Sequence, residues 1–395
     1  MRIGINGYYL TTQHAGIGQY SINLLKALAE IDKENKYYVF VPKEIEWDFP
    51  KNFILKIIKP LPLFTKTFFN RFIWEEYQLG WAIKQYKIDV FHGLYQSLPR
   101  NSDKIANVVT IHDAIPWRFP FERKQLSYRL YTDYRKELVK KRAKKVITIS
   151  ETSKLDFAPV YGFKPETIEV TYESIDPIFW EKPTPSEIKK FKEHYQIKNN
   201  FILYTGGLKR HKNLRMLIKA FSILVHDYGY KGDLYILGAI RNTMAISPFI
   251  YYQIPDLEKY ARMKKVNHKV RFIGFVSRKD MSLFIHTAEC FVSISLYEGF
   301  GLPALEAMTS GCPSVLSNLG AYPEIAQDAA LFVYPYGPHR VANTLNKVLT
   351  DEKIRNYLIK KGLERAKFFD RIKIAKRVLE IYKEVYDDYK ISFQP

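Results

Sequence analysis

The sequence is poor in cysteine and contains no long apolar run. Cys290 and Cys312 are its only cysteines among 395 residues, and both lie in apolar surroundings. Two such cysteines suit a reducing compartment, and their spacing builds no metal site. No stretch approaches the roughly 18 uninterrupted apolar residues of a membrane-spanning helix. The opening residues, MRIGINGYYL, lack the apolar segment and cleavage site of a signal peptide. We therefore expect a cytoplasmic protein.

Acidic residues are scarce relative to basic ones. Lysine and arginine number 61 against 41 aspartates and glutamates, which gives a formal net charge of +20. This excess favours an anionic partner, which could be nucleic acid, an anionic membrane or a phosphate-bearing substrate. Net charge alone does not choose among them. With 47% hydrophobic and 26% charged residues, the chain has the composition of a folded globular protein and not of a disordered one.

Short β-branched or aromatic runs alternate with longer amphipathic stretches, a pattern typical of buried parallel strands in βα units. The expected strands of the first half are 2–6, 37–41, 53–58, 88–91, 107–111, 145–149 and 168–171. Those of the second half are 201–205, 233–237, 270–273, 290–294, 313–316 and 331–333. Three prolines between residues 177 and 185 interrupt the series, and we expect this proline-rich segment to be a linker. A charged helix is expected over 372–389. We predict an α/β protein of two doubly wound domains joined near residue 177, with ligands at the carboxyl ends of the strands.

The first loop of interest, residues 14–20, follows the first strand. Gly16 and Gly18 enter a helix there, which lets backbone amides approach a phosphate. A dinucleotide fingerprint would need a third glycine where Ser21 stands and an acid after the next strand, which instead ends in Val-Pro-Lys. The nicotinamide interpretation is therefore disfavoured, while a glycine turn without a ligand stays open.

Two further loops carry polar residues at strand ends. His112 and Asp113 close the fifth expected strand, where the histidine could donate a hydrogen bond to a sugar hydroxyl or a phosphate, although a structural histidine is the commoner outcome. Residues 206–213, GGLKRHKN, combine a glycine pair, three cations and a helix start. Backbone amides, helix dipole and positive charge there favour a diphosphate site over a solvated basic turn.

The fourth loop is the most specific. In residues 295–308, SLYEGFGLPALEAM, a Gly-Phe-Gly-Leu-Pro turn separates Glu298 from Glu306. The spacing puts Glu298 at a strand end and Glu306 two turns into the next helix, with Pro303 in its first turn. One carboxylate could then bind sugar hydroxyls and the other a ribose, with amides near the phosphates.

Together these loops resemble glycosyltransferase family 4, whose members are retaining, use nucleotide sugars and have the GT-B architecture of two Rossmann-like domains facing across a cleft. The resemblance covers nearly the whole chain. It implies domains at 1–176, completed by a C-terminal helix at about 378–395, and at 177–377, the first on the acceptor side and the second binding the nucleotide sugar. The segments that carry it are AGIGQYSINLL, TIHDAIPWRFP, VITISETSKLDF, YTGGLKRHKN and SLYEGFGLPALEAMTSGCPSV.

The resemblance implies roles for individual residues. Glu298 would bind the hydroxyls of the transferred sugar, Glu306 the nucleotide ribose and Lys212 the diphosphate. His112 would hydrogen-bond the sugar, and residues 275–277 would face the base. The catalytic residues implied are His112, Lys212 and Glu298. The donor-binding residues implied are Gly16, Asp113, Gly206, Gly207, Lys209, Arg210, Val276, Phe300, Gly301, Leu302 and Glu306.

Two positions depart from the family pattern. Ala15 stands where the first loop usually has the first glycine of a pair. The arginine that usually accompanies the diphosphate lysine is missing, since its place holds Gly207 in one spacing and His211 in the other. Either Lys209 or Arg210 could supply the second positive charge.

The mechanism implied needs no metal. Many transferases hold a divalent metal on an Asp-x-Asp motif, and this sequence contains none. Lys212, neighbouring cations and helix N-termini would then stabilise the leaving diphosphate, while the transferring sugar becomes oxocarbenium-like. The resemblance implies retention of anomeric configuration, with a phosphate oxygen as base and no dedicated protein nucleophile.

The substrates are less sharply indicated. The HDAIP segment looks most like mannosyltransferases, so GDP-mannose is favoured over a UDP-sugar as donor. Residues 51–71 carry five cations, four phenylalanines and no acid, and residues 118–145 carry 11 cations against three acids. Basic and aromatic residues together suit an anionic bilayer, although a core strand and a solvated helix face explain them equally well. A membrane-peripheral enzyme on the cytoplasmic face would act on a saccharide or a lipid-linked cell-envelope glycan.

Other function classes stay open. A nucleic-acid-binding protein would explain the charge, but no DNA- or RNA-binding module is recognisable and the Glu298–Glu306 element would have no role. A GT-B epimerase or phosphorylase is closer, although no acid cluster or cofactor lysine supports it. A non-catalytic scaffold with the same fold is compatible with the missing arginine.

Overall fold

The chain divides into two compact units. The computed structural model describes residues 1–12, 16–62, 67–119, 126–238 and 254–392. Contacts assign Met1–Ser174 and Asp370–Pro395 to the first unit and Ile175–Phe369 to the second. The chain therefore leaves the first unit two residues before the expected boundary at 176/177, and it returns at Asp370 rather than at about residue 378.

The first unit is built on a parallel sheet of seven strands in the order β3-β2-β1-β4-β5-β6-β7. Strands β2 and β3 lie on one side of β1, and strands β4 to β7 lie on its other side. The topological switch is therefore between β1 and β4. Ligands of doubly wound sheets bind outside the carboxyl ends at such a point. The strands are β1 (Arg2–Asn6), β2 (Lys36–Val41), β3 (Phe53–Ile57), β4 (Val90–Gly93), β5 (Ala106–Ile111), β6 (Lys145–Thr148) and β7 (Ile168–Val170).

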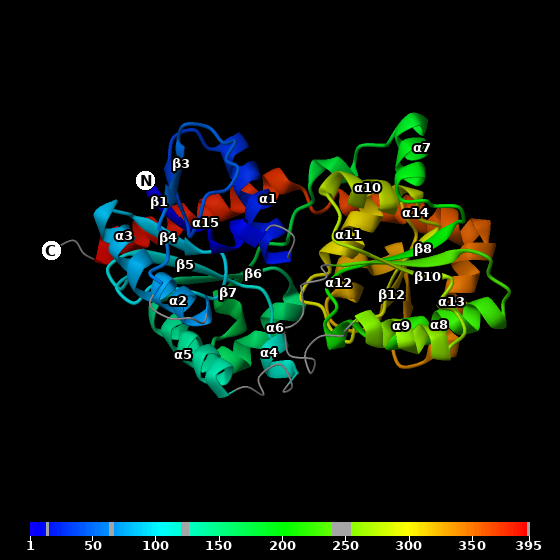
Figure 1. Cartoon of the computed structure of the whole chain (residues 1–395). Helices are drawn as coiled ribbons and strands as arrows, with labels where there is room; N and C mark the ends of the chain where they lie inside the picture. The colour runs from blue at the N-terminus through cyan, green and yellow to red at the C-terminus, as the bar shows by residue number, and fades with distance from the viewer. Residues whose placement is uncertain (13–15, 63–66, 120–125, 239–253, 393–395) are drawn as a thin grey trace. The chain divides into compact units, whose positions relative to one another are not determined.

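Helices and short helical turns connect these strands. The last helix of the chain, α15, packs against α1 in this unit (Figure 1). Buried apolar side chains from the strands and from α3, α5 and α6 form one core cluster. The α-helices are α1 (Gly16–Ile31), α2 (Thr67–Ile73), α3 (Leu79–Gln85), α4 (Ile115–Arg118), α5 (Leu126–Arg142), α6 (Glu151–Tyr161) and α15 (Arg371–Ser392). The turns are the 3-10 helices η1 (Tyr8–Thr12) and η4 (Pro165–Thr167) and the π-helical turn η2 (Trp74–Gln78).

The second unit has a parallel sheet of six strands in the order β10-β9-β8-β11-β12-β13. Its topological switch lies between β8 and β11, and the apolar face of α8 packs into the core beside the sheet. The strands are β8 (Phe201–Thr205), β9 (Asp233–Leu237), β10 (Val270–Gly274), β11 (Cys290–Ser293), β12 (Ser314–Ser317) and β13 (Ala330–Val333).

The helices of the second unit include those of the proline-rich segment. That segment is not an extended linker, because Asp176 caps η5 and Thr184 forms a capping box at the start of α7. The α-helices are α7 (Pro185–His194), α8 (Leu214–His226), α9 (Ile254–Met263), α10 (Arg278–Thr287), α11 (Leu302–Thr309), α12 (Tyr322–Ala326), α13 (Pro338–Thr350) and α14 (Glu352–Ala366). The 3-10 turns are η5 (Pro177–Phe179), η6 (Arg210–Lys212) and η8 (Gln327–Ala329).

The α/β class and the two doubly wound sheets predicted from the sequence are confirmed. Every expected strand has a counterpart, and most boundaries agree within one residue. The largest shift is at β4, expected over 88–91 and found at Val90–Gly93. The reason is local: Lys87 has a positive φ of 50°, and the Ile88 amide donates to the Ile83 carbonyl, so Ile88 closes the preceding helix.

Candidate active site

The loops after β8 and β11 meet at the topological switch of the second sheet. The β8 loop carries the glycine pair and the cations, and the β11 loop carries Glu298. The amide of Leu296 donates to the carbonyl of His211 at 2.7 Å, which ties the two loops together. The two segments that the sequence singled out as most specific for a diphosphate and a sugar are therefore neighbours.

Lys212 and Glu298 form an ion pair. The ammonium Nζ of Lys212 lies 2.6 Å from Oε1 and 2.7 Å from Oε2 of Glu298. Both side chains are largely buried. Asn213, next in the chain, adopts a left-handed conformation with φ 60° and donates from Nδ2 to the carbonyls of Ile294 and Pro335. This turn holds Lys212 at the end of η6 and directs its side chain toward the β11 loop.

Glu298 is a buried carboxylate stabilised in its charged form. Burial raises the pKa of the Glu298 carboxyl, but the charges of Lys212 and His211 and hydrogen bonds from Lys212 and Ser295 hold that pKa below its usual range. The hydroxyl of Tyr322 lies 3.4 Å from Oε1 of Glu298. The carboxylate is therefore ionised at neutral pH and can accept hydrogen bonds from hydroxyl groups.

Two glycines shape the backbone around Glu298. Gly301 has φ 97° and precedes α11, where a Cβ would lie 2.5 Å from the ring of Tyr322. Gly320 has φ 65°, and a Cβ there would lie 2.6 Å from the amide nitrogen and 2.8 Å from the carbonyl oxygen of Glu298. Only glycine combines a positive φ with the absence of a Cβ, so only glycine fits at these two positions. Gly320 belongs to the loop after β12, which sequence reasoning did not connect with the site.

The remaining residues of the β8 loop lie around the same turn. The Gly206 amide donates to the Leu237 carbonyl at 3.0 Å, and Gly207 is exposed with open space on its Cβ side. Lys209 immediately precedes η6 and Arg210 begins it, and both side chains are half-buried. Either cation is thus within one short turn of Lys212.

Glu306 is held by an arginine that sequence reasoning missed. It is the fifth residue of α11, so it lies about one turn into the helix and not two as expected. Nη1 of Arg278 donates to Oε1 of Glu306 at 2.6 Å, and Nε of Arg278 lies 3.6 Å from Oδ2 of Asp176. The guanidinium carbon stands 4.5 Å from the ring centre of Phe179. Arg278 therefore links Glu306 to the segment that opens the second unit.

The other positions expected to contact the donor from this unit lie at the same edge of the sheet. Val276 follows the end of β10 and is buried, next to the exposed Phe275. Phe300 is buried and packs its ring edge-on against Phe369, with ring centres 5.6 Å apart. Leu302 is the first residue of α11, whose N-terminus is suited to an anion.

In the first unit, His112 is directed into the protein. Its Nε2 lies 2.9 Å from the Leu94 carbonyl, so this nitrogen carries the proton and donates it. Nδ1 lies 3.7 Å from Oε1 of Glu173, and the ring stands edge-on to Tyr20. Asp113 accepts a hydrogen bond from the Ile115 amide at the start of α4. None of these contacts of His112 and Asp113 could be predicted from the His-Asp pair itself.

Gly16 is the first residue of α1 and is exposed, and apart from its own helix backbone no atom of the described residues lies within 4 Å of the position that a Cβ would occupy. The helix that follows is long enough to present an anion-binding N-terminus. Ala15, the departure from the family pattern in this loop, lies outside the described residues.

Among the described residues, no group of three or more His, Cys, Asp or Glu side chains is placed to hold a metal ion. The described helices also include none that combines the length and apolar character needed to cross a membrane.

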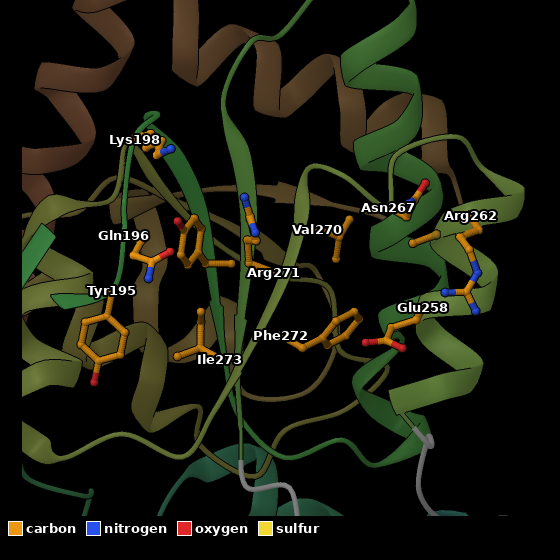
Figure 2. A pocket seen from close by; sticks show the side chains of 12 residues that line it. Tyr195, Gln196, Lys198, Glu258, Arg262, Asn267, Val270, Arg271, Phe272 and Ile273 are labelled. Carbon is orange, nitrogen blue, oxygen red and sulfur yellow. The ribbon is translucent and has the colours of Figure 1, made fainter. Parts of the chain in front are cut away.

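A pocket of about 530 Å³ lies elsewhere in the second unit (Figure 2). Its walls come from the segment before β8, including Tyr195 and Gln196, from β10, including Arg271, and from α9, including Glu258. Because the segment at 195–198 precedes β8, it lies toward the amino end of that strand. This pocket is distinct from the loops that carry Lys212 and Glu298.

Comparisons with known proteins agree on one family. A model described as Glycosyltransferase Family 4 matches residues 14–178, and one described as Glycosyl transferases group 1 matches residues 186–365. The O-antigen chain mannosyltransferase B of Escherichia coli is 25% identical over 381 residues, which cover 93% of this chain and 96% of that protein.

Solved structures share the fold. Sucrose-phosphate synthase from Thermosynechococcus elongatus superposes with a TM-score of 0.78 at 18% identity, covering 98% of this chain and 100% of that one. The Anabaena protein HepE in complex with UDP-glucose superposes with a TM-score of 0.74 at 17% identity, covering 97% and 100% of the two chains. With both family models matched in sequence order and a doubly wound parallel sheet in each unit, the chain belongs to glycosyltransferase family 4 and has the GT-B architecture.

Proposed function

We propose that this glycosyltransferase moves a hexose, with mannose favoured, from a nucleoside-diphosphate sugar to a hydroxyl of a saccharide or lipid-linked glycan, with retention of anomeric configuration. The observation that carries the proposal is the Lys212–Glu298 ion pair between the loops after β8 and β11. The mannosyltransferase relative supports the choice of sugar and a role in cell-envelope polysaccharide synthesis. Family membership does not favour a nucleic-acid-binding protein, an epimerase, a phosphorylase or a scaffold.

In this proposal the second unit binds the donor. Lys212, with Lys209 or Arg210, contacts the diphosphate, and Glu298 accepts hydrogen bonds from the sugar hydroxyls. Glu306 binds the ribose, Val276 lies at the base, and the backbone of residues 300–302 and the glycine pair 206–207 line the sugar diphosphate. From the first unit, Gly16, His112 and Asp113 contact the sugar and phosphates, and His112 would use its ring only after exchanging the Leu94 or Glu173 contact.

The chemistry follows from the leaving group. The bond between the anomeric carbon and the diphosphate oxygen breaks, and positive charge develops on the sugar while negative charge develops on the diphosphate. The acceptor hydroxyl attacks the anomeric carbon on the face that the diphosphate leaves, and its proton passes to a phosphate oxygen. Lys212 stabilises the developing negative charge, a contribution of several kcal/mol in comparable sites. Because fixed cations provide this stabilisation, we propose that no metal is needed.

A surface of α5 supports a membrane-associated acceptor. Leu126 and Leu130 are 66% and 61% exposed one helical turn apart, and Arg129 between them is also exposed. Apolar side chains rimmed by cations suit the boundary of an anionic bilayer. We propose that the first unit binds the acceptor and that the enzyme works at the cytoplasmic surface of a membrane.

A panel of nucleotide sugars tests the donor. A ligand present at about 100 times its dissociation constant stabilises the folded protein by roughly 2.7 kcal/mol. We expect GDP-mannose to raise the melting temperature more than UDP-sugars, and the same shift in EDTA. A panel without any shift would contradict donor binding, loss of the shift in EDTA would contradict metal independence, and inverted product stereochemistry by NMR would contradict retention.

A further inference from the structure

Two arginines from the two basic stretches of the sequence meet at the topological switch of the first sheet. Arg71 lies at the end of the stretch 51–71, and Arg135 lies in α5 within the stretch 118–145. Tyr8 follows β1 and Tyr95 follows β4, the two strands that flank the switch. The carboxyl ends of β1 and β4 are where ligands of such a sheet bind.

Aromatic rings surround the Arg71 guanidinium. Its carbon lies 4.4 Å from the ring centre of Tyr8, 4.9 Å from that of Tyr9 and 5.5 Å from that of Tyr95. The Tyr95 ring also lies 5.7 Å from the guanidinium carbon of Arg135. We call these five side chains, Arg71, Arg135, Tyr8, Tyr9 and Tyr95, the arginine–tyrosine cluster.

Glu75 forms an ion pair with each of the two arginines. Oε1 of Glu75 accepts from Nε and Nη2 of Arg71 at 3.2 and 3.1 Å, and Oε2 lies 2.8 Å from Nη1 of Arg135. Glu75 sits on the π-helical turn η2, a departure from regular helix that is frequent at functional sites. Two guanidinium charges therefore share a single buried carboxylate.

The carboxyl of the neighbouring Glu76 does not neutralise the remaining positive charge of the two arginines. Burial raises the pKa of Glu76 to about 7 despite the opposing charge of Arg135. At neutral pH this group is protonated in a large fraction of molecules. The cluster with Glu75 and Glu76 therefore carries a net positive charge inside the protein, an arrangement that is costly without a further anion.

Arg135 keeps one edge of its guanidinium unpaired. The residue is 3% exposed, and among the described residues its Nε and Nη2 have no hydrogen-bond partner. These two nitrogens lie side by side on one edge of the planar group, the edge that binds phosphate or carboxylate oxygens in a bidentate manner. Buried polar groups are nearly always hydrogen-bonded, so an unpaired edge of this kind calls for a ligand.

We propose that the arginine–tyrosine cluster binds a phosphate group of the acceptor, held by the free edge of Arg135 and by Arg71. Tyr95 lies over both arginines and is half-buried, and in this proposal its ring turns aside when the phosphate enters. The inference rests on the proposed function, since it assumes that the first unit takes the acceptor. A phosphate is favoured over a neutral glycan because only an anion balances the buried charge.

Titration with inorganic phosphate tests the site. The protein is first saturated with the nucleoside diphosphate that stabilises it best, so that the donor site is occupied, and calorimetry then measures phosphate binding. We expect Arg135→Lys, which keeps the charge and removes the bidentate edge, to bind phosphate about tenfold more weakly. Arg71→Lys should show a loss of similar size, and it keeps the inference testable if the Arg135 variant does not fold.

Arg142→Lys is the matched control. Arg142 lies in the same helix and is also buried, but its Nε is bonded to Asp103 and its Nη1 to the carbonyl of Pro99. This variant should bind phosphate like the wild type. Equal binding by the wild type, Arg135→Lys and Arg142→Lys would overturn the inference, and so would absence of binding by the wild type. Stronger binding of glucuronate than of phosphate would overturn the phosphate assignment.

A second titration distinguishes a lipid-linked phosphate from a water-soluble one. A prenyl diphosphate in detergent micelles is titrated in the same way. Tighter binding than inorganic phosphate, lost in Arg135→Lys, supports a lipid-linked acceptor, while equal binding supports a water-soluble phosphate ester. Donor-induced shifts in melting temperature are measured on all variants. If the donor binds and the arginine variants still match the control, the inference alone fails; if no nucleotide sugar binds, the proposed function fails.

Discussion

The ammonium group of Lys212 lies between the two carboxylate oxygens of Glu298, at 2.6 and 2.7 Å. The two residues were expected to serve different parts of the donor, one the diphosphate and the other the sugar. In the structure each is the other's counter-ion. In the proposed function, donor binding would exchange this one contact for two, with phosphate oxygens replacing the carboxylate at Lys212 and sugar hydroxyls replacing the ammonium at Glu298.

Breaking this pair should cost stability as well as activity. Lys212→Met leaves the Glu298 carboxylate buried without its counter-ion, a change that destabilises proteins by about 3 kcal/mol or more. We expect kcat to fall roughly 100-fold or more, since the positive charge proposed to stabilise the leaving diphosphate is lost. Urea unfolding should show that the double variant Lys212→Met/Glu298→Gln is more stable than Lys212→Met alone. A double variant that is less stable than both single variants would contradict a paired role.

The acid stability of the second unit should depend on Glu298. Its pKa is lowered in the folded protein from 4.5, so the unfolded chain binds the proton more readily. Its contribution to stability is present above pH 4.5 and is lost as the pH falls through the lower, folded-state value. Glu298→Gln should therefore lose less unfolding free energy than the wild type between about pH 6 and pH 3. Identical acid dependence in the two proteins would show that the group does not contribute.

Arg278 should act on the donor through the ribose. Arg278→Met removes the hydrogen bond that holds Glu306, so we expect KM for the nucleotide sugar to rise about tenfold with little change in kcat. A 2′-deoxyribose donor should reduce the difference between variant and wild type if Glu306 contacts that hydroxyl. Lys279→Met is the control, since Lys279 is the next residue and forms an exposed ion pair with Glu187. A variant effect of the same size with both donors would contradict a role at the ribose.

Gly320 offers a test of the close approach to Glu298. Gly320→Ala places a methyl group 2.6 Å from the Glu298 amide nitrogen, in addition to the strain of a positive φ. Gly229→Ala is matched in conformation, with φ 72°, but apart from its chain neighbours no atom of the described residues lies within 4 Å of its Cβ position. The control variant should lose about 1 kcal/mol of unfolding free energy from backbone strain alone. Gly320→Ala should lose more and should also weaken donor binding, as measured by thermal shift; equal losses would show that the contact is relieved elsewhere.

Membrane association should depend on the exposed leucines of α5. Leu126→Ser/Leu130→Ser removes apolar side chains without changing charge, and we expect reduced sedimentation with anionic vesicles. Leu155→Ser is the control, because Leu155 is 63% exposed on α6 in the same unit. Similar sedimentation of the double variant, the control and the wild type would contradict a docking role for this surface.

Much of the fold was predictable because its signals are local. Each strand is an apolar run bounded by turn residues, and the order of strands and helices alone indicates a doubly wound α/β chain. The candidate site could be proposed as a set of loops for the same reason, since glycine pairs, cations and the Glu298–Glu306 spacing each occupy one short stretch.

The partners of those residues were not predictable, because they are distant in the chain. Glu298 is 86 residues from Lys212, and Arg278 is 28 residues from Glu306. No local pattern marks Arg278, which looks like an ordinary charged residue in the first turn of a helix. The inward direction of the His112 ring depends on a carbonyl at Leu94 and a carboxylate at Glu173, which only the assembled sheet brings together.

The last helix has a consequence for how the chain is made. Val378, Ile381 and Tyr382 of α15 are buried in the first unit, yet they leave the ribosome after residue 369, where the second unit ends. Domains usually fold in the order of their synthesis. Here the first unit cannot be completed until α15 has been made, while Ile175–Phe369 is one uninterrupted stretch that can fold during translation. A chain that has emerged from the ribosome only as far as Phe369 would thus present a complete second unit and a first unit still exposing the face of α1 that α15 covers, which makes that interval a natural point of engagement for chaperones.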